Sequence, residues 1–124
     1  MTKNILIIED EVFISMILED TLEKFGYNVI DKIRFGEEVM EKLDVYPNKP
    51  DLVFSDIYLA GDMSGIDSAK LIKEKYDIPI IFMSAFSDEG TIKEAETVDH
   101  YDYIFKPFDE EKLEETLKNL FKEE

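Results

Sequence analysis

The chain of 124 residues is 44% hydrophobic and 35% charged, a composition typical of one globular domain with one core. Its formal net charge of −16, from 30 Asp and Glu against 14 Lys and Arg, argues against direct binding to nucleic acid and against adhesion to anionic lipid. Cysteine is absent, which excludes disulfides and cysteine zinc sites, and no apolar run is long enough for a membrane span or an export signal, so the cytoplasm is the expected location.

The first half of the chain alternates between short apolar runs and amphipathic segments. Residues 4–8 form an apolar run that predicts a buried strand, and residues 11–25 carry a helical pattern that ends before Gly26. Residues 27–33 indicate a second strand and residues 36–44 a short helix. The apolar run at residues 52–54 predicts a third strand, buried on both faces, with Asp56 where the strand should end.

The second half repeats the alternation. Ser64 and Asp67 have the spacing of a capping box that opens a helix to about residue 76. Residues 80–83 predict a strand that ends at Ser84, residues 87–97 a helix opened by Ser87, residues 101–105 the last strand, and Asp109 the cap of a final helix. Five strand–helix alternations with short connections predict an α/β fold, a parallel sheet with helices on both faces.

Polar residues stand where four of these strands end. Glu9 and Asp10 follow the first strand, Asp56 ends the third, Ser84 the fourth, and Lys106 follows the fifth. The carboxyl ends of parallel strands share one edge of a sheet, so these residues should lie together. Two carboxylates about 4 Å apart repel by roughly 4 kcal/mol at an effective dielectric near 20. The cluster therefore predicts a divalent cation, and its oxygen ligands suit Mg²⁺.

Four motifs, taken together, resemble the signature of two-component response-regulator receiver domains, in particular the stand-alone, chemotaxis-regulator-like ones. The motifs are Ile8-Glu-Asp10, the Asp56 strand end, Met83-Ser-Ala85 and Phe105-Lys-Pro-Phe108. The resemblance covers essentially the whole chain. It implies a flavodoxin-like, doubly wound, five-stranded parallel sheet of strand order 2-1-3-4-5, in a single receiver domain over residues 1–124.

The resemblance also implies a signalling switch of a two-component system. By position in the family, Asp56 accepts a phosphoryl group from a phosphohistidine on a sensor kinase. Glu9, Asp10 and Asp56 hold Mg²⁺, aided by the backbone carbonyl of Tyr58. This chemistry agrees with the residue types, because phosphoryl transfer needs charge neutralisation and in-line positioning more than covalent assistance.

Three further residues acquire roles by the same resemblance. The Ser84 hydroxyl and the Lys106 ammonium bind phosphoryl oxygens. Tyr103 occupies the position of the switch aromatic, which swings inward as Ser84 is drawn toward the phosphoryl group. The peptide bond before Pro107 is expected to be cis, as it usually is in the family.

The chain departs from the family pattern at a few positions. Asp102 precedes the switch aromatic, where a small residue is common, and bulky Tyr58 and Phe86 stand where side chains control water access to a phosphoaspartate. These residues bear on the lifetime of the phosphoryl group rather than on its transfer. His100 is the only histidine, has no partner at ligand spacing, and is predicted to be a surface residue.

The helix at residues 11–25 carries more apolar bulk than its inward stripe needs. Ile14 and Ile17 form either a wide buried face or, together with the Pro107-Phe108 turn, a partner surface beside the strand ends. In the family, this side meets the helical bundle of a sensor kinase. We expect Ile14 to be the more exposed of the two isoleucines, with Ile17 closer to the inward stripe.

Two other classes of protein compete with this interpretation. An Mg²⁺-dependent aspartyl-phosphate phosphohydrolase of the haloacid-dehalogenase type would place an acid two residues after the nucleophile, where this chain has Tyr58. A flavodoxin would need a hydroxyl-rich phosphate loop where Glu9-Asp10-Glu11 stands. We therefore expect a protein that catalyses only its own phosphorylation and dephosphorylation. Its partners would be a sensor histidine kinase or phosphotransfer protein and an unknown downstream protein, and it would be a monomer or a phosphorylation-dependent dimer.

Overall fold

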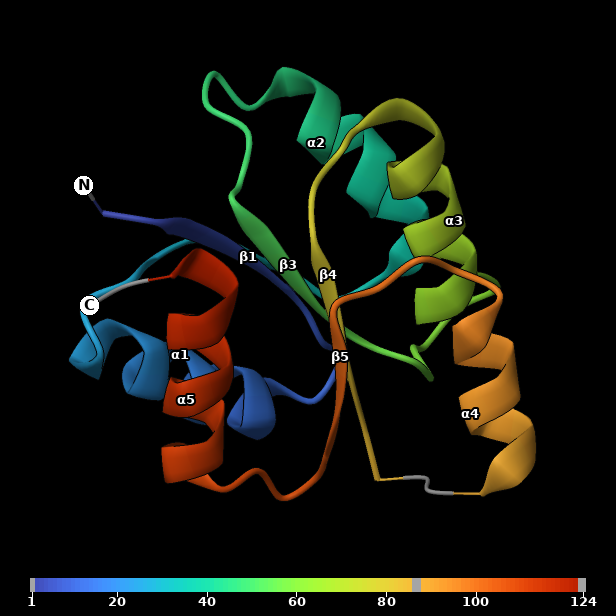
Figure 1. Ribbon diagram of the computed structural model, residues 1–124. Helices are drawn as coiled ribbons and strands as arrows, with labels where there is room; N and C mark the ends of the chain where they lie inside the picture. The colour runs from blue at the N-terminus through green and yellow to red at the C-terminus, as the bar shows by residue number, and fades with distance from the viewer. Residues whose placement is uncertain (1, 86–87, 123–124) are drawn as a thin grey trace.

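A five-stranded parallel sheet forms the centre of the molecule, in the order β2-β1-β3-β4-β5 (Figure 1). The computed structural model describes residues 2–85 and 88–122. The strands are β1 (Asn4–Ile8), β2 (Asn28–Ile33), β3 (Leu52–Asp56), β4 (Ile80–Ser84) and β5 (Asp102–Phe105). Every residue of β3 and β4 is buried, as expected for central strands of a sheet covered on both faces. The predicted fold class and strand order are confirmed.

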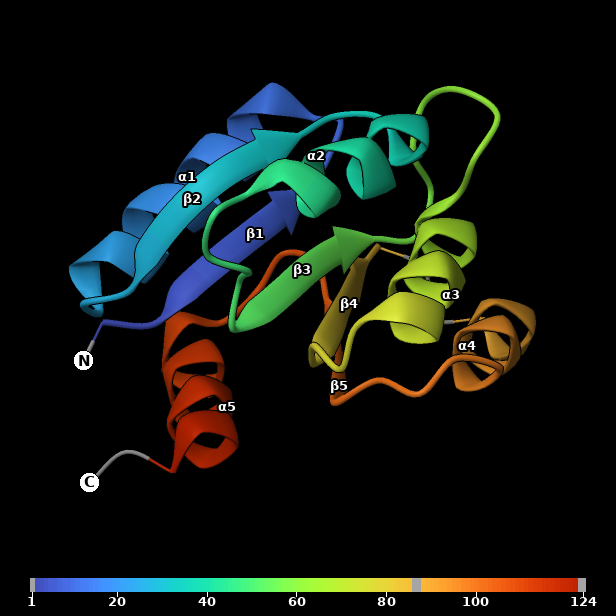
Figure 2. The same ribbon diagram turned by 90° about the horizontal axis from the view of Figure 1, so that it is seen from above.

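Helices cover both faces of the sheet. Figures 1 and 2 show α1 (Val12–Lys24) and α5 (Glu110–Phe121) against one face, and α2 (Val39–Val45), α3 (Gly65–Lys75) and α4 (Glu89–Glu96) against the other. Successive strand side chains point to opposite faces, so the sheet separates two apolar clusters. The first contains Ile5, Ile7, Phe54 and Ile81 with Leu18, Leu22, Leu113 and Leu117, and the second contains Leu6, Ile8, Val53 and Phe82 with Val39, Leu43, Ile66 and Ile72.

Most predicted boundaries lie within two residues of those in the structure. The predicted capping box is present, since Asp67 N–H donates to Ser64 Oγ at 3.1 Å and Ser64 N–H donates to the Asp67 carboxylate at 3.2 Å. The helix expected from residue 87 begins at Glu89, and its cap is Asp88, which accepts from the Thr91 N–H. Ser87 lies outside the described residues.

Two further expectations have different outcomes. The segment 36–44 begins as a short 3₁₀ turn (Gly36–Glu38) before α2, so it is not one continuous α-helix. The Lys106–Pro107 peptide bond is cis, as expected.

Gly65 places the start of α3 directly against the end of β3. Its N–H donates to the Ile57 carbonyl at 2.8 Å. A Cβ atom at this position would lie 1.7 Å from the backbone oxygen of Asp56 and 2.8 Å from Ser55 Oγ. Only glycine allows the two backbones to approach this closely, and the approach fixes α3 beside the strand end that carries Asp56.

We predict that Gly65→Ala destabilises the protein by about 1–3 kcal/mol or more, because the backbone that it meets cannot move aside without separating α3 from β3. Gly90→Ala is the matched control, since Gly90 lies in α4 and its Cβ would approach nothing closer than 3.4 Å. That variant should keep or gain stability, by less than about 1 kcal/mol, because alanine is the better helix former. Urea denaturation compares the two, and equal midpoints would contradict the prediction.

Candidate functional site

The carboxyl ends of β1, β3 and β5 bring two carboxylates and one ammonium group into a buried cluster. Lys106 Nζ donates to a Glu9 carboxylate oxygen and, at 3.1 Å, to Asp56 Oδ2. Its third acidic neighbour is Glu11, at 3.6 Å. The side chains of Glu9, Asp56 and Lys106 are 4%, 8% and 9% exposed, so these charges interact with little screening by water.

This cluster has one ammonium group for two buried carboxylates, so its negative charges are not fully balanced. The pKa of Glu9 is raised to about 7, first by burial and then by the negative charge of Asp56, against the opposing effect of the hydrogen bond from Lys106. Burial alone would lower the pKa of Lys106, but its hydrogen bonds and charge interactions with Glu9 and Asp56 outweigh burial and raise that pKa. A protonated carboxyl or an added cation would relieve the repulsion.

Carboxylate oxygens of Glu9, Glu11 and Asp56 all lie within 4.8 Å of one another, a donor set of the kind that Mg²⁺ prefers. The predicted set was Glu9, Asp10 and Asp56. Asp10 is not in this group, and its carboxylate accepts from the Ala60 N–H at 3.1 Å. Sequence reasoning missed Glu11 as an acid of this cluster, although Glu11 directly continues the acidic run after β1.

The two oxygens of Asp56 have different partners. Oδ1 accepts from the Ile57 N–H at 2.8 Å, and Oδ2 accepts from Lys106 Nζ. The backbone of the strand is itself fixed at this point by the contact of Gly65 with the Asp56 carbonyl. The carboxylate of Asp56 therefore has a defined orientation at the end of the central strand.

Ser84 and Tyr103 lie beside the acidic cluster. Ser84 is 1% exposed at the end of β4, and its backbone carbonyl accepts from the Lys106 N–H at 2.9 Å. Burial raises the pKa of Tyr103, while a side-chain hydrogen bond with Ser84 acts in the opposite direction. The Tyr103 ring is half-buried, 5.2 Å from the ring of Phe105. The two residues expected to act together are thus in direct contact.

The residues expected to form a partner surface border one hollow of about 520 Å³. Its lining includes Ile14, Ile17, Lys106, Pro107 and Phe108. The predicted order of exposure was wrong, because Ile17 is 56% exposed whereas Ile14 is partly buried. The helical repeat explains the difference: Ile14 lies four residues before buried Leu18 and so on nearly the same side of α1, whereas Ile17 is turned about 100° away.

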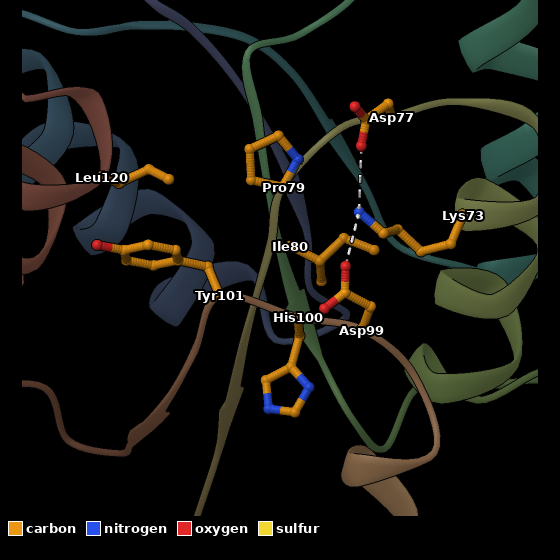
Figure 3. Close-up of a pocket in the computed structure, with 8 residues that line it drawn as sticks. All are labelled: Lys73, Asp77, Pro79, Ile80, Asp99, His100, Tyr101 and Leu120. Carbon is orange, nitrogen blue, oxygen red and sulfur yellow. Dashed lines mark ion pairs between the residues drawn. The ribbon is translucent and has the colours of Figure 1, made fainter.

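A separate hollow of about 430 Å³ lies at the opposite edge of the sheet, by the start of β4 and the segment before β5 (Figure 3). The ammonium of Lys73 stands between two carboxylates, 4.0 Å from Asp77 and 3.8 Å from Asp99. It also donates to the Ile78 carbonyl at 3.1 Å. The two carboxylates that pair with Lys73 are almost fully exposed, whereas Glu9 and Asp56 are buried, so the strand-end cluster is the stronger candidate site.

His100 borders that second hollow and is not the surface residue that the sequence suggested. Its ring is half-buried, with its centroid 5.0 Å from that of Phe82. Its Nδ1 lies 2.8 Å from the Val98 carbonyl. His100 therefore packs at the margin of the core.

Two other expectations concern the rest of the chain. Phe86, which with Tyr58 was expected to control water access to a phosphoaspartate, lies outside the described residues. None of the described helices has the length and apolar character needed to span a bilayer.

Comparison with known proteins gives one consistent result. Residues 5–118 match the family described as the response regulator receiver domain. The chain is 35% identical over 123 residues to the chemotaxis protein CheY of Thermotoga maritima, covering 98% of this chain and 100% of that protein. It is 34% identical over 106 residues to the transcriptional regulatory protein PdtaR of Mycobacterium tuberculosis, covering 86% of this chain but 50% of PdtaR.

Solved structures agree with the sequence matches. The signal receiver domain of a modulated diguanylate cyclase from Desulfovibrio desulfuricans is 27% identical, with a TM-score of 0.89, and the match covers 98% of this chain and 95% of that chain. The receiver domain of a signal transduction histidine kinase from Syntrophus aciditrophicus is 28% identical, with a TM-score of 0.86, covering 98% and 91%. With its 2-1-3-4-5 sheet and acidic strand-end cluster, the chain belongs to the response regulator receiver domain family of two-component signalling.

Proposed function

We propose that Asp56 is the phosphoacceptor of this receiver domain. The observation that supports this proposal is the buried carboxylate of Asp56 at the end of the central strand, 3.1 Å from the ammonium of Lys106. A carboxylate oxygen of Asp56 attacks the phosphorus of a phosphohistidine, the P–N bond breaks as the O–P bond forms, and the histidine nitrogen leaves with the electron pair and takes up a proton. Lys106 and the hydroxyl of Ser84 bind oxygens of the transferred group.

Mg²⁺ fits the same proposal. Glu9, Asp10 and Asp56, with the backbone carbonyl of Tyr58, are the proposed ligands, and Glu11 is a further carboxylate within reach of the cluster. When bound, the ion would neutralise the charge that gathers on the phosphoryl oxygens. The alternative phosphohydrolase is not favoured, since the position of its general acid is taken by Tyr58, whose phenol bonds to Thr91 in α4.

The partners of the domain follow from this chemistry. We infer that a sensor histidine kinase or a phosphotransfer protein supplies the phosphoryl group and docks at the hollow bordered by Ile14, Ile17, Pro107 and Phe108. A cytoplasmic location fits, because phosphohistidines are made from ATP. The phosphorylated domain then acts on a downstream protein or passes the group on, with Tyr103 as the switch aromatic, as a monomer or as a phosphorylation-dependent dimer. Its catalysis is limited to its own phosphorylation and dephosphorylation.

The first test concerns the phosphoacceptor. Asp56→Asn should abolish the phosphoryl adduct that forms with acetyl phosphate and Mg²⁺, because the amide is not a nucleophile of comparable strength. Asp62→Asn is the control, an exposed acid of the same loop that should leave labelling unchanged. Intact mass gives the result, and full labelling of the Asp56→Asn variant would exclude the assignment.

The second test uses the raised pKa of Glu9. Because the folded-state value of about 7 lies above the ordinary 4.5, the metal-free protein should lose stability as pH rises from about 5 to 8. Glu9→Gln, which cannot ionise, should lack this loss. The difference should be up to about 3 kcal/mol, since one pKa unit corresponds to about 1.4 kcal/mol.

Urea denaturation at pH 5 and pH 8 measures this difference. Added Mg²⁺ should restore the stability of the wild type at pH 8 far more than that of Glu9→Gln, because a bound cation removes the repulsion that the variant lacks. Parallel pH profiles for the two proteins, or indifference of the wild type to Mg²⁺, would contradict the prediction.

The third test concerns docking. Ile17→Ala should change the free energy of unfolding by no more than about 0.5 kcal/mol, because the side chain is largely exposed, and should slow phosphoryl transfer from the cognate kinase without slowing labelling by acetyl phosphate. Val45→Ala, an equally apolar exposed site on α2, is the control and should transfer at the wild-type rate. Equal kinase transfer rates for Ile17→Ala and Val45→Ala would remove Ile17 from the docking surface.

A further inference from the structure

The side chain of Tyr58 connects the loop beside the acidic site to α4. Tyr58 lies two residues after Asp56, in the loop between β3 and α3. Its phenolic oxygen is 2.9 Å from Oγ1 of Thr91, a residue of α4 that is only 3% exposed. This hydrogen bond, between residues 33 positions apart, joins the loop after Asp56 to α4, which lies on the same face of the sheet as α3 (Figure 2).

The direction of this hydrogen bond follows from the other partner of Thr91. Thr91 Oγ1 lies 2.9 and 3.0 Å from the two carboxylate oxygens of Asp88. The hydrogen bonds from the Thr91 N–H and hydroxyl lower the pKa of Asp88, so this carboxylate is charged at neutral pH and can only accept. A hydroxyl carries one proton, so Thr91 donates to Asp88 and accepts from Tyr58. The three residues form a directed chain, Tyr58 to Thr91 to Asp88.

The end of this chain is fixed by the helix itself. Asp88 is the N-cap of α4 and also accepts from the Thr91 N–H at 3.0 Å. The charged acceptor strengthens the bond from the Thr91 hydroxyl, which in turn polarises that hydroxyl as an acceptor for Tyr58. Two other hydrogen bonds of the loop run to different elements, from the Ala60 N–H to Asp10 and from the Met63 N–H to Glu37. The Tyr58 phenol therefore gives the loop an anchor on α4.

We propose that Thr91, oriented by Asp88, is a positioning residue for the acidic site, because it holds the Tyr58 loop in place through the Tyr58 phenol. The proposal rests on the proposed function, in which this loop supplies a ligand to Mg²⁺. A loop that is already ordered binds more tightly than one that must be ordered on binding. Loss of either hydroxyl should therefore weaken Mg²⁺ binding, although neither hydroxyl is a ligand. By linkage, Mg²⁺ should stabilise the first turn of α4 to the same extent.

The test is a double-mutant cycle on Mg²⁺ affinity, measured by calorimetric titration of the intact chain. Tyr58→Phe and Thr91→Val should each raise the Kd for Mg²⁺ about 2- to 10-fold, the range for the loss of one hydrogen bond. The double variant should be no weaker than the weaker single variant, because both changes break the same chain. Thr97→Val is the matched control, the same substitution at the other end of α4, where the hydroxyl donates to the Glu94 carbonyl of its own helix.

Amide hydrogen exchange gives a second measurement. If the Tyr58–Thr91 hydrogen bond only stabilised the fold, Mg²⁺ would not change the exchange rates of the α4 amides. Mg²⁺ should slow exchange of the Thr91 and Ile92 amides in the wild type and do so much less in Tyr58→Phe. This variant should fold normally, because the side chain of Tyr58 is half-exposed. Wild-type Kd values in both single variants, or additive effects in the double variant, would overturn this inference while leaving the proposed function intact. Failure of the wild type to bind Mg²⁺ would overturn both.

Discussion

The burial of two carboxylates beside one ammonium group is the constraint on which the rest of this structure depends. Removing a charge from water costs several kcal/mol unless it is paired, and Lys106 offers one positive charge to both Glu9 and Asp56. The apolar strands bear this cost. Burial of apolar side chains opposes this cost, since each fully buried Ile, Leu or Phe contributes about 1.5–3 kcal/mol. The site keeps an excess of negative charge within a well-packed apolar core, and such a site can bind a cation.

The parts of the structure that the sequence predicted are those fixed by backbone periodicity. Apolar runs, and a looser alternation for the second strand, located all five strands, and the parallel arrangement then placed Asp56, Lys106 and Ser84 on one edge. The relative exposure of Ile14 and Ile17 was open to the same reasoning, because the angular positions of both residues follow from the helical repeat once Leu18 is taken as inward. The helical repeat therefore predicts that Ile14 is the more buried of the two.

Other features depend on side-chain conformation and could not be predicted from periodicity. Asp10 and Glu11 are adjacent in sequence, and which of them faces Asp56 depends on how the chain turns from β1 into α1. The bond from Tyr58 to Thr91 joins distant positions and depends on one rotamer of the tyrosine. His100 has no sequence pattern that distinguishes packing against Phe82 from exposure to solvent. Each of these features depends on a contact between side chains of different helices, strands or loops, and a local sequence pattern does not specify such contacts.

The close approach of Gly65 to the Asp56 carbonyl has a consequence for how the chain can vary among its descendants. Where a side chain is crowded by other side chains, a second substitution nearby can make room. Here the obstacle is main-chain oxygen, which every amino acid carries, so no change at position 56 creates space at position 65. A lineage that loses this glycine can recover the contact only by reverting or by moving α3 as a whole. Substitutions at neighbouring positions therefore cannot compensate for the loss of Gly65, whichever partner the domain binds.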